Sequence, residues 1–401
     1  MSLPHAPRVT LLGPDIDHRA SLEAMLRGHA EALSWMPDSS CYFHDRPATA
    51  GRRLRRALDQ FRGTQDPIFR EALVRHLDAH HTDVVIAYWG TNPLADLVAI
   101  RQLRPRIRLV LMVLCYPLSL DPIGVARQHW LIRRAARHLD GVLFPSEAMR
   151  GHFHAHRLLA DAPQPIDELI LPPCWPASFQ QTGAQPQAAS DAANLIFVGR
   201  TDLSHPTIHA ADDLREPMQA LLDAGIELHH VRSPETSDGH PLRRPFEPAT
   251  QPELLRRMAG HDASLIMYNT GRCRRADRFD LTVPDRMISS VAAGVPIALP
   301  AQGYRASKAY LAKYPALIEF TSIADLARQL ADREQVAALR HAAWEARRHY
   351  AAEVHGADLT NFLSGLVGRG RPARSDQPAG HGRATISTRP APLSRGIDQA
   401  A

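Results

Sequence analysis

Short apolar runs rich in β-branched residues alternate with longer amphipathic stretches along this chain, and the alternation occurs twice. The first series has strand-like runs at 8–12, 83–88, 109–114, 141–144 and 168–171, and the second at 195–198, 226–231, 264–268, 295–299 and 317–320. Strands separated by helical patterns predict βαβ units and parallel sheets. We therefore expect an α/β protein with two doubly wound, Rossmann-like domains. Ligands of such sheets bind beyond the carboxyl ends of the strands, so the two domains should face a cleft.

The intervening stretches predict helices, among them 19–34, 94–103 and a segment at 322–366 that is helical throughout. Ser146 lies two residues after the strand at 141–144 and is a favoured N-cap residue. The first domain should cover 1–175 and the second 194–345, with a linker at 176–193 inside a stretch rich in Pro, Gln, Ala and Ser. A helix at 346–367 should return to the first domain. The tail, 368–401, is rich in Gly, Pro, Ser and Arg and is predicted to be disordered.

The basic net charge of +5 comes mostly from that tail, which has six Arg and two Asp and therefore a balance of +4. The nearly neutral body gives no indication of nucleic-acid binding. No apolar run reaches the roughly 18 residues of a membrane span, and no leader-like segment precedes the first strand. The four Cys show no CxxC spacing and are expected to be free thiols. These features favour a cytoplasmic protein.

Four segments resemble glycosyltransferases of the GT-B fold, especially the large family-4-like group. Residues 283–300 (VPDRMISSVAAGVPIALP) resemble the donor-site motif, with Pro284, Arg286, Ala292, Gly294 and Pro296 in its order and spacing. The run LIFVGR at 195–200 is similar to the strand that opens the second domain of that family, and LLRRMAGHDASLIMYN at 254–269 to the helix and strand before the donor motif. Residues 138–153 resemble a strand that ends in Ser before a helix. The likeness covers most of 8–350 in order.

The resemblance implies a metal-independent, hexosyltransferase-like enzyme of glycan or polysaccharide biosynthesis that needs no cofactor. It would transfer a sugar from a UDP- or GDP-sugar to a sugar or lipid-linked acceptor held by the first domain. No nucleic acid is expected as a partner, and peripheral membrane contact stays open. In physical terms, the departing diphosphate needs cations and helix N-termini to stabilise its charge. Arg200, just past a strand end, and Arg286, in the first turn of the helix opened by Pro284, are suited to that role, although either could be a surface residue.

The other predicted site residues follow from the same comparison. Asp15 could be a general base toward an acceptor hydroxyl, although a turn role for Asp15 and a capping role for Asp17 are alternatives. Residues expected to bind substrate are Gly13 in the loop after the first strand, His205, Tyr268, Asn269, Pro284, Ser289 and Ser290. No metal ligand is assigned.

The chain departs from the family pattern at two acidic positions. Ser289 stands where the family usually has a Glu that accepts hydrogen bonds from the donor ribose, and Leu281 stands eight positions earlier, where a second acidic residue is usual. These departures favour one alternative, a GT-B-fold binding or scaffold protein without catalysis. A dinucleotide-dependent oxidoreductase is disfavoured because no Gly-x-Gly-x-x-Gly follows any strand.

Overall fold

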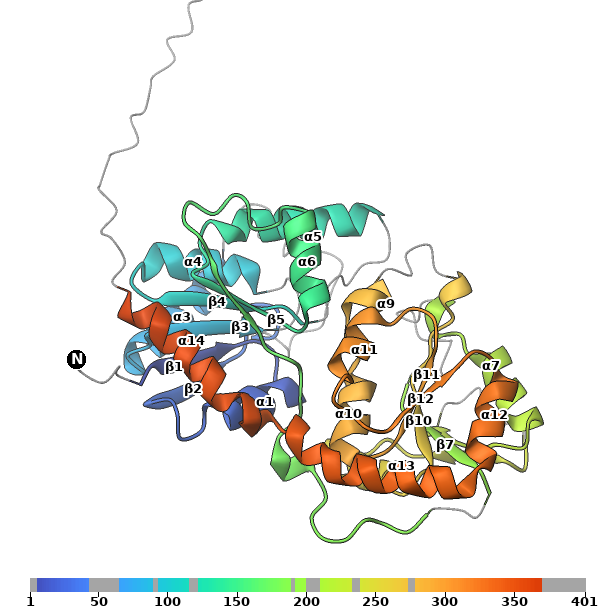
Figure 1. Cartoon of the computed structure of the whole chain (residues 1–401). Helices are drawn as coiled ribbons and strands as arrows, with labels where there is room; N and C mark the ends of the chain where they lie inside the picture. Colours follow the sequence, from blue (N-terminus) through green and yellow to red (C-terminus); the bar gives the residue numbers. More distant parts are fainter. Residues whose placement is uncertain are drawn as a thin grey trace, which may run out of the picture. The chain divides into compact units, whose positions relative to one another are not determined.

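Two six-stranded parallel sheets form the centre of the structure (Figure 1). The computed structural model describes residues 6–42, 65–88, 93–114, 122–188, 192–199, 210–232, 239–272 and 278–369. The first sheet has the order β2-β1-β3-β4-β5-β6, with β1 (Arg8–Leu12), β2 (Ala32–Met36), β3 (Val84–Tyr88), β4 (Arg108–Met112), β5 (Gly141–Phe144) and β6 (Asp167–Ile170). The second has the order β12-β11-β10-β7-β8-β9, with β7 (Asn194–Phe197), β8 (Glu227–Val231), β9 (Arg243–Phe246), β10 (Ala263–Leu265), β11 (Ile297–Pro300) and β12 (Leu317–Phe320). The predicted α/β class with two doubly wound sheets is confirmed.

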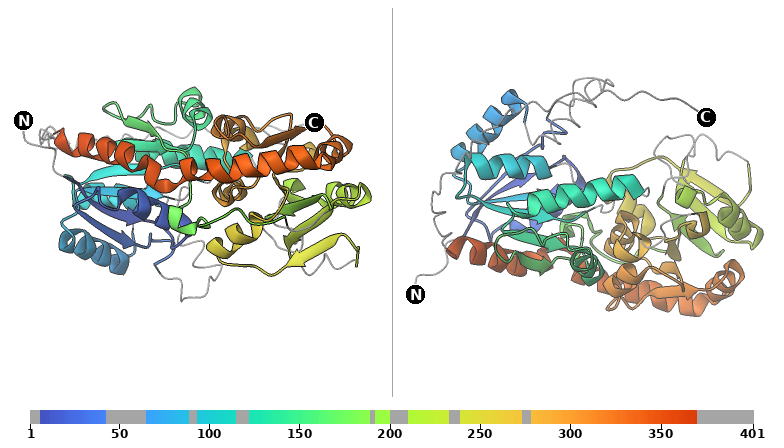
Figure 2. Two further views of the ribbon diagram at one scale, coloured as in Figure 1. Left: turned by 60° about the horizontal axis from the view of Figure 1, so that its bottom comes forward. Right: turned by 90° about the horizontal axis from the view of Figure 1, so that it is seen from above.

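Helices connect the strands and cover both faces of each sheet (Figure 2). Those beside the first sheet are α1 (Asp17–Leu26), α3 (Pro67–Ala79), α4 (Leu94–Leu103), α5 (Pro122–Ala136) and α6 (Glu147–Ala155). Those beside the second are α7 (Arg215–Asp223), α8 (Gln251–Met258), α9 (Arg278–Leu281), α10 (Asp285–Ala293), α11 (Arg305–Tyr310), α12 (Ile323–Ala331) and α13 (Arg333–Ala346). The last helix, α14 (Gly356–Gly368), belongs to the first sheet. We call the first sheet with its helices the N-terminal lobe and the second the C-terminal lobe.

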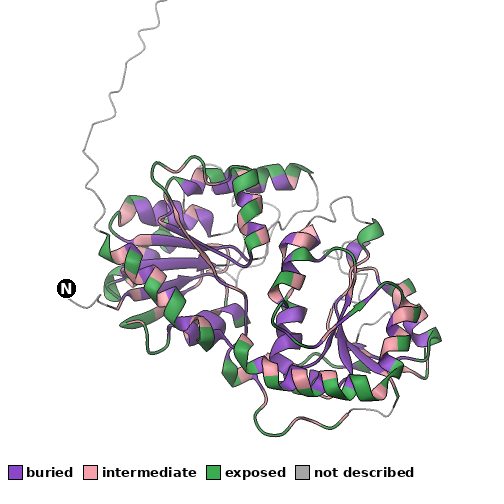
Figure 3. Ribbon diagram, viewed as in Figure 1, coloured by how far each residue is buried: buried purple, intermediate pink, exposed green. Residues whose placement is uncertain are grey.

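The hydrophobic core consists of four layers, one on each face of each sheet. Strand β3 shows how the layers arise, because its side chains alternate between the faces. Val85 and Ala87 pack with α3 to α6, whereas Val84, Ile86 and Tyr88 pack with α1 and α14. Because both faces are covered, the strand is buried along its whole length, which is why its sequence is an unbroken apolar run (Figure 3).

Each sheet reverses its strand order at one point. The chain adds β2 on one side of β1 and then β3 on the other, so the first sheet reverses between β1 and β3. In the second sheet the reversal lies between β7 and β10. Loops that follow the two strands of such a pair diverge and leave a crevice at the carboxyl ends, where doubly wound proteins bind ligands. The topology therefore selects two places in which to look for a site.

Two chain segments connect the lobes and lie side by side. Residues 171–181 lead from β6 toward β7, and residues 347–355 lead from α13 back to α14. Trp175 forms a parallel bridge with Ala351, and its carbonyl accepts a hydrogen bond from the Ala352 amide at 3.0 Å. The Gln180 side-chain amide donates to the Arg347 carbonyl at 3.1 Å. The predicted linker is thus anchored along its first part rather than loose.

Three secondary-structure predictions differ from the structure. The helix predicted for 19–34 ends at Leu26, because Gly28 takes a positive φ of 78° and Ala32–Met36 then forms the edge strand β2. Strand β9 was not predicted, since its sequence, RRPF, is polar and contains a proline that only an edge strand accommodates well. The helical segment predicted at 322–366 is broken at Asp332, which caps α13, and again at the crossing over 347–355.

The chain divides into a compact unit, Met1–Arg369, that contains both lobes, and a second unit, Gly370–Ala401. The second unit lies outside the described residues, so the structure does not test the predicted disorder of the tail. Within the described ranges, no helix has the length and apolar composition needed to cross a bilayer. Neither Cys41 nor Cys174 forms a disulfide bond, as expected, whereas Cys115 and Cys273 fall outside the described residues.

A buried histidine next to α8 makes the stability of the C-terminal lobe depend on pH. His261 is 3% exposed, its Nδ1 lies 3.0 Å from the Arg257 carbonyl, and its ring meets the His229 ring edge-on at 4.4 Å. Burial, followed by the charge of His229, lowers the pKa of His261 from 6.5 to about 4. Burial also lowers the pKa of His229. The folded state therefore favours neutral imidazoles.

We predict that the free energy of unfolding falls as the pH drops from about 6.5 to about 4. In this range His261 is protonated in the unfolded chain but stays neutral in the folded protein, so protonation favours unfolding. The His261 shift corresponds to about 3 kcal/mol. His261→Asn keeps a donor near the Nδ1 position and should flatten the decline, whereas His341→Asn, at an exposed site on α13, should not. Urea titrations between pH 4 and 7.5 measure this. Equal pH dependence in both variants would contradict the prediction.

Candidate active site

Arg286 occupies the reversal point of the second sheet. Its guanidinium lies 4.1 Å from the Tyr268 ring centroid and 5.2 Å from that of Phe197. A Cβ added to Gly199 would lie 2.7 Å from the Arg286 NH1 atom. Gly199 follows β7 and Tyr268 follows β10, so the guanidinium stands between the two strands at which the sheet reverses. Among the described residues no carboxylate forms an ion pair with it, so its charge is available to an anion.

The helix that carries Arg286 starts at this crevice. Pro284 is the N-cap of α10, one position earlier than the predicted first helical position, and Asp285 begins the helix. The first backbone N–H groups of a helix have no intrahelical acceptor and favour anions, so α10 adds positive potential beside Arg286. Gly294 ends α10 with a φ of 67°, where a Cβ would lie 2.9 Å from the Trp344 Cα. Gly294 therefore permits a close approach of α10 to α13.

The aromatic ring of Tyr268, which faces the Arg286 guanidinium, is itself held by two further aromatic residues. Tyr268 stacks on Phe279 with ring centroids 4.1 Å apart, and its backbone N–H donates to the Tyr304 hydroxyl at 2.9 Å. Tyr304 is 3% exposed, and burial raises its pKa to about 12, so the hydroxyl stays protonated. Its backbone is left-handed, with φ at 60°, a conformation that costs energy for a residue with a Cβ. The fold thus holds Tyr304 in a strained conformation where it fixes Tyr268.

The reversal point of the first sheet is built around Gly13. A Cβ on Gly13 would lie 2.9 Å from the ring and carbonyl of Tyr88, at the end of β3, so no larger residue fits. The Tyr88 hydroxyl donates to the Pro14 carbonyl at 2.6 Å, and the Trp35 indole N–H donates to the Gly13 carbonyl at 3.1 Å. The predicted loop after β1 is therefore held rigidly at the carboxyl edge of its sheet.

Carboxylates from both lobes gather near the start of α1. Asp15 is 67% exposed and pairs with Arg19 at 2.9 Å. Burial raises the pKa of Asp17, His18 opposes that shift, and the charges of Asp285 and Asp15 add to it. The buried His18 places its Nε2 3.2 Å from the Asp285 carboxylate. The first turns of α1 and α10 therefore meet, which brings the predicted residues of the two reversal points into one region.

The two serines of α10 are buried rather than open to a ligand. Ser289 is 3% exposed, and its Oγ accepts hydrogen bonds from the Trp175 indole at 3.0 Å and from the Gln251 side-chain amide at 2.6 Å. Ser290 is fully buried, and its Oγ donates to the Arg286 carbonyl or to the Ser264 hydroxyl. Both hydroxyls are engaged within the protein.

Leu281, at the other position where the resemblance expects an acidic residue, is 5% exposed and packs into a core layer of the N-terminal lobe. Its carbonyl accepts a hydrogen bond from the Ser146 hydroxyl at 3.3 Å. Ser146 also caps α6 by accepting from the Met149 amide, as predicted. Position 281 thus contributes to packing across the lobes, and position 289 to packing between α10, α8 and the segment that connects the lobes.

Other predicted residues lie elsewhere or fall outside the described ranges. Asn269 donates its side-chain amide to the Asp213 carbonyl at 3.1 Å, and its backbone N–H donates to Ala211 at 2.7 Å, so it anchors the 211–213 turn. Arg200 and His205 lie outside the described residues. The sequence did not point to four further residues of the region, because nothing local marks a side chain whose partners lie far away in the chain. They are Trp175, Gln251, His18 and Tyr304.

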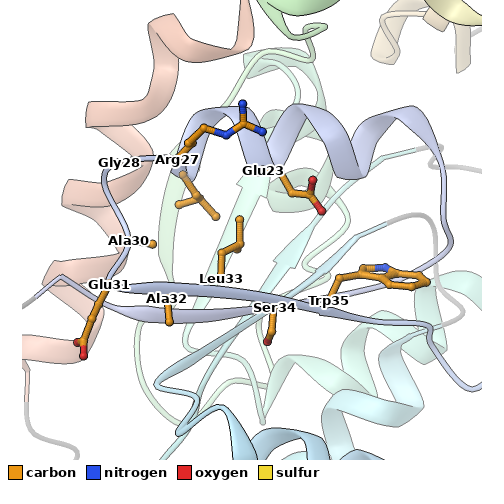
Figure 4. Close-up of a pocket in the computed structure, with 10 residues that line it drawn as sticks. Glu23, Arg27, Gly28, Ala30, Glu31, Ala32, Leu33, Ser34 and Trp35 are labelled. Atoms are coloured by element: carbon orange, nitrogen blue, oxygen red, sulfur yellow. The ribbon is translucent and has the colours of Figure 1, made fainter.

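Two hollows of the described residues lie away from this region. One, of about 420 Å³, is lined by Arg27, Glu31, Leu33 and neighbours between the end of α1 and β2 (Figure 4). The other, of about 580 Å³, is lined by residues between α6 and β6, including Phe153 and Pro163. Both are formed by the loops that lead into strands, at the amino edge of the sheet. The reversal points open at the opposite edge.

Comparisons with known proteins identify the architecture. No protein-family model matches the chain, and no curated protein matches it in sequence. Among solved structures, it is similar to the sucrose-phosphate synthase of Thermosynechococcus elongatus (TM-score 0.59, 11% identity, 90% of this chain and 99% of that one). It is also similar to the N-terminal domain of the Candida albicans trehalose-6-phosphate phosphatase (TM-score 0.61, 12% identity, 91% and 98%). A third similar structure is Anabaena HepE in complex with UDP and glucose (TM-score 0.52, 13% identity, 89% and 99%). The chain has the fold of the GT-B glycosyltransferases.

Proposed function

We propose that the protein is a glycosyltransferase that binds a UDP- or GDP-sugar at the reversal point of its second sheet and transfers the sugar to an acceptor held by the N-terminal lobe. The observation that carries the proposal is the Arg286 guanidinium, placed between the ends of β7 and β10 beside the start of α10 and without a carboxylate partner in the described ranges. The similar HepE structure is a complex with UDP and glucose, which supports a uridine nucleotide as the first donor to test.

Arg286 would hold the diphosphate and stabilise its charge as it departs. A guanidinium can contact two phosphate oxygens at once, and the Tyr268 ring beneath it fixes its plane. Together with the N-terminus of α10, it supplies positive charge without a metal ion, so we propose a metal-independent reaction. Arg200 and His205 remain proposed further contacts. Tyr268 and Pro284 would border the donor, while Asn269, Ser289 and Ser290 would act only through the backbone that they fix.

The proposed general base is an aspartate of the loop after β1. Asp15 is the sequence-based candidate, but its carboxylate already pairs with Arg19. Asp17 begins α1, and burial together with the charge of Asp285 raises its pKa, which makes it a stronger base than an ordinary aspartate. We therefore place Asp17 ahead of Asp15 in this role, with Gly13 setting the course of the loop. A cytoplasmic setting is part of the proposal and agrees with the absence of a disulfide bond at Cys41 and Cys174.

A second candidate function is a nucleotide-binding scaffold without catalysis. The burial of Leu281 and Ser289 favours it, because the two positions where the resemblance expects acidic side chains contact the protein itself. The two candidates agree on nucleotide binding and differ on turnover.

The first prediction concerns donor binding. Arg286→Gln should weaken UDP or UDP-glucose binding by about 100-fold, the equivalent of about 3 kcal/mol, because it removes two charge-assisted hydrogen bonds. Arg286→Lys should have an intermediate affinity, since lysine keeps the positive charge but cannot bind two phosphate oxygens with one planar group. Arg328→Gln, at a 77% exposed site on α12, is the matched control and should bind as the parent does. Isothermal calorimetry with UDP, GDP and their sugars measures this. Absence of binding to every nucleotide, or unchanged binding by Arg286→Gln, would refute the proposed donor site.

The second prediction concerns the base. Asp17→Asn should lower the rate of UDP release from UDP-glucose by about 100-fold or more while nucleotide affinity is unchanged, whereas Asp15→Asn should change the rate only a few-fold. The parent rate should rise with pH through a pKa above the ordinary aspartate value of 3.8, as Asp17 loses its proton, and Asp17→Asn should lose that rise. Turnover retained in Asp17→Asn would remove the base role. Nucleotide binding with no turnover in the parent would favour the scaffold. Both assays are run with and without EDTA.

A further inference from the structure

Helix α5 carries an unusual solvent face on the N-terminal lobe. From residue 122 to residue 139 the sequence PIGVARQHWLIRRAARHL contains four arginines and no acidic residue. At 100° per residue, Ile123, Arg127, Trp130 and Arg134 fall within an arc of about 60°. Within that arc the two large apolar side chains, Ile123 and Trp130, lie next to Arg134 and Arg127. Arg137 directly follows the last residue of α5 and is exposed. We call these five residues the α5 surface.

The opposite side of α5 already supplies its share of the core. Val125, Leu131, Ile132 and Ala135 are all buried beneath the helix. The fold therefore does not need Ile123 or Trp130 for its core, and both are exposed. Ile123 is 83% exposed, the largest value for a large apolar side chain in the described ranges, and Trp130 is 41% exposed. Exposed residues run along the outer side of α5 (Figure 3).

The arginines are arranged around these apolar groups. The Arg134 guanidinium lies 5.3 Å from the centroid of the Trp130 ring. Next to the surface, Arg133 donates to the His156 carbonyl at 2.7 Å, which fixes α5 against the end of α6. The exposed His156 and Arg157 extend the basic character toward that side. The surface thus combines a tryptophan, an isoleucine and several cations on a rigid helix.

We propose that the α5 surface docks the protein on an anionic lipid bilayer, with α5 lying parallel to the membrane plane. A helix with Lys or Arg around large apolar side chains is the usual form of an interfacial anchor. Tryptophan favours the headgroup level, and arginines there contact lipid phosphates while their stems cover apolar surface. A nucleic acid would match the arginines but would leave Ile123, without an aromatic ring to stack, at the centre of the contact. If the proposed function holds, this surface would bring the N-terminal lobe, which holds the acceptor, to an acceptor in the membrane. Only this last point rests on the proposed function.

The test is sedimentation of the full chain with vesicles of phosphatidylcholine alone and with 30% phosphatidylglycerol (about one anionic lipid in three). We expect binding to the anionic vesicles that falls with added salt. Ile123→Ser/Trp130→Ser should reduce the partition coefficient by about tenfold or more. Arg127→Gln/Arg134→Gln should reduce it by about 25-fold at low salt, at about fivefold per arginine.

Matched controls come from α3 of the same lobe, where Ile68 is 57% exposed and Arg75 is 73% exposed. Ile68→Ser and Arg70→Gln/Arg75→Gln should bind vesicles as the parent does. A variant with the six tail arginines changed to Gln separates the tail from α5 and should keep most of the binding. Vesicle binding does not require the donor site, so Arg286→Gln should bind vesicles normally even if every nucleotide assay fails.

Several outcomes would overturn the proposal. They are absence of binding to anionic vesicles, equal binding by the parent and by both α5 variants, and loss of binding only in the tail variant. Binding to RNA that competes fully with vesicles and survives Ile123→Ser/Trp130→Ser would assign the arginines to a nucleic acid instead. Circular dichroism of each variant checks that α5 is folded.

Discussion

The indole of Trp175 is the contact on which the arrangement of the candidate site depends. It is 2% exposed, donates its N–H to Ser289 in α10, and has the His18 ring of α1 at 4.8 Å. Its own backbone pairs with the segment that returns to α14. The side chain of Trp175 therefore connects the middle of α10 with the start of α1, and its backbone connects the two crossings between the lobes. Because α10 also carries Arg286, in its first turn, the position of the proposed phosphate contact depends on packing at Ser289, three residues further along the helix.

The two reversal points have different chemical characters, although the sheets are topologically alike. The second presents a cation over an aromatic ring beside a helix N-terminus, which suits a phosphate. The first presents Gly13 and the aspartates of its loop, which suit a hydroxyl that must lose a proton. The His18–Asp285 contact joins them at 3.2 Å. A group-transfer reaction needs both characters within reach of one substrate, and the structure supplies them from separate halves of the chain.

Local sequence patterns predicted much of the fold, whereas contacts between residues that are far apart in the sequence could not be predicted. Buried parallel strands such as Val84–Tyr88 are unbroken apolar runs and were found with their helices, whereas the edge strands β2 and β9 bury too few side chains to leave such a pattern. The motif around Pro284 and Arg286 located the start of α10 to within a residue. The partners of Ser289 could not be predicted, because Gln251 lies 38 residues and Trp175 114 residues away in the chain, and only the tertiary fold brings them together.

The two missing acidic residues are best understood from that packing. A carboxylate at 281 would be buried in an apolar layer of the N-terminal lobe, and one at 289 would displace the short hydroxyl that accepts from Trp175 and Gln251. Burying an unpaired charge costs several kcal/mol, more than a hydrogen bond to a ribose hydroxyl returns. Leaving-group stabilisation makes a different demand, because a developing negative charge requires cations and N–H donors rather than carboxylates. Arg286 and the start of α10 meet that demand, so the electrostatic basis of the proposed reaction does not depend on acidic residues at positions 281 and 289.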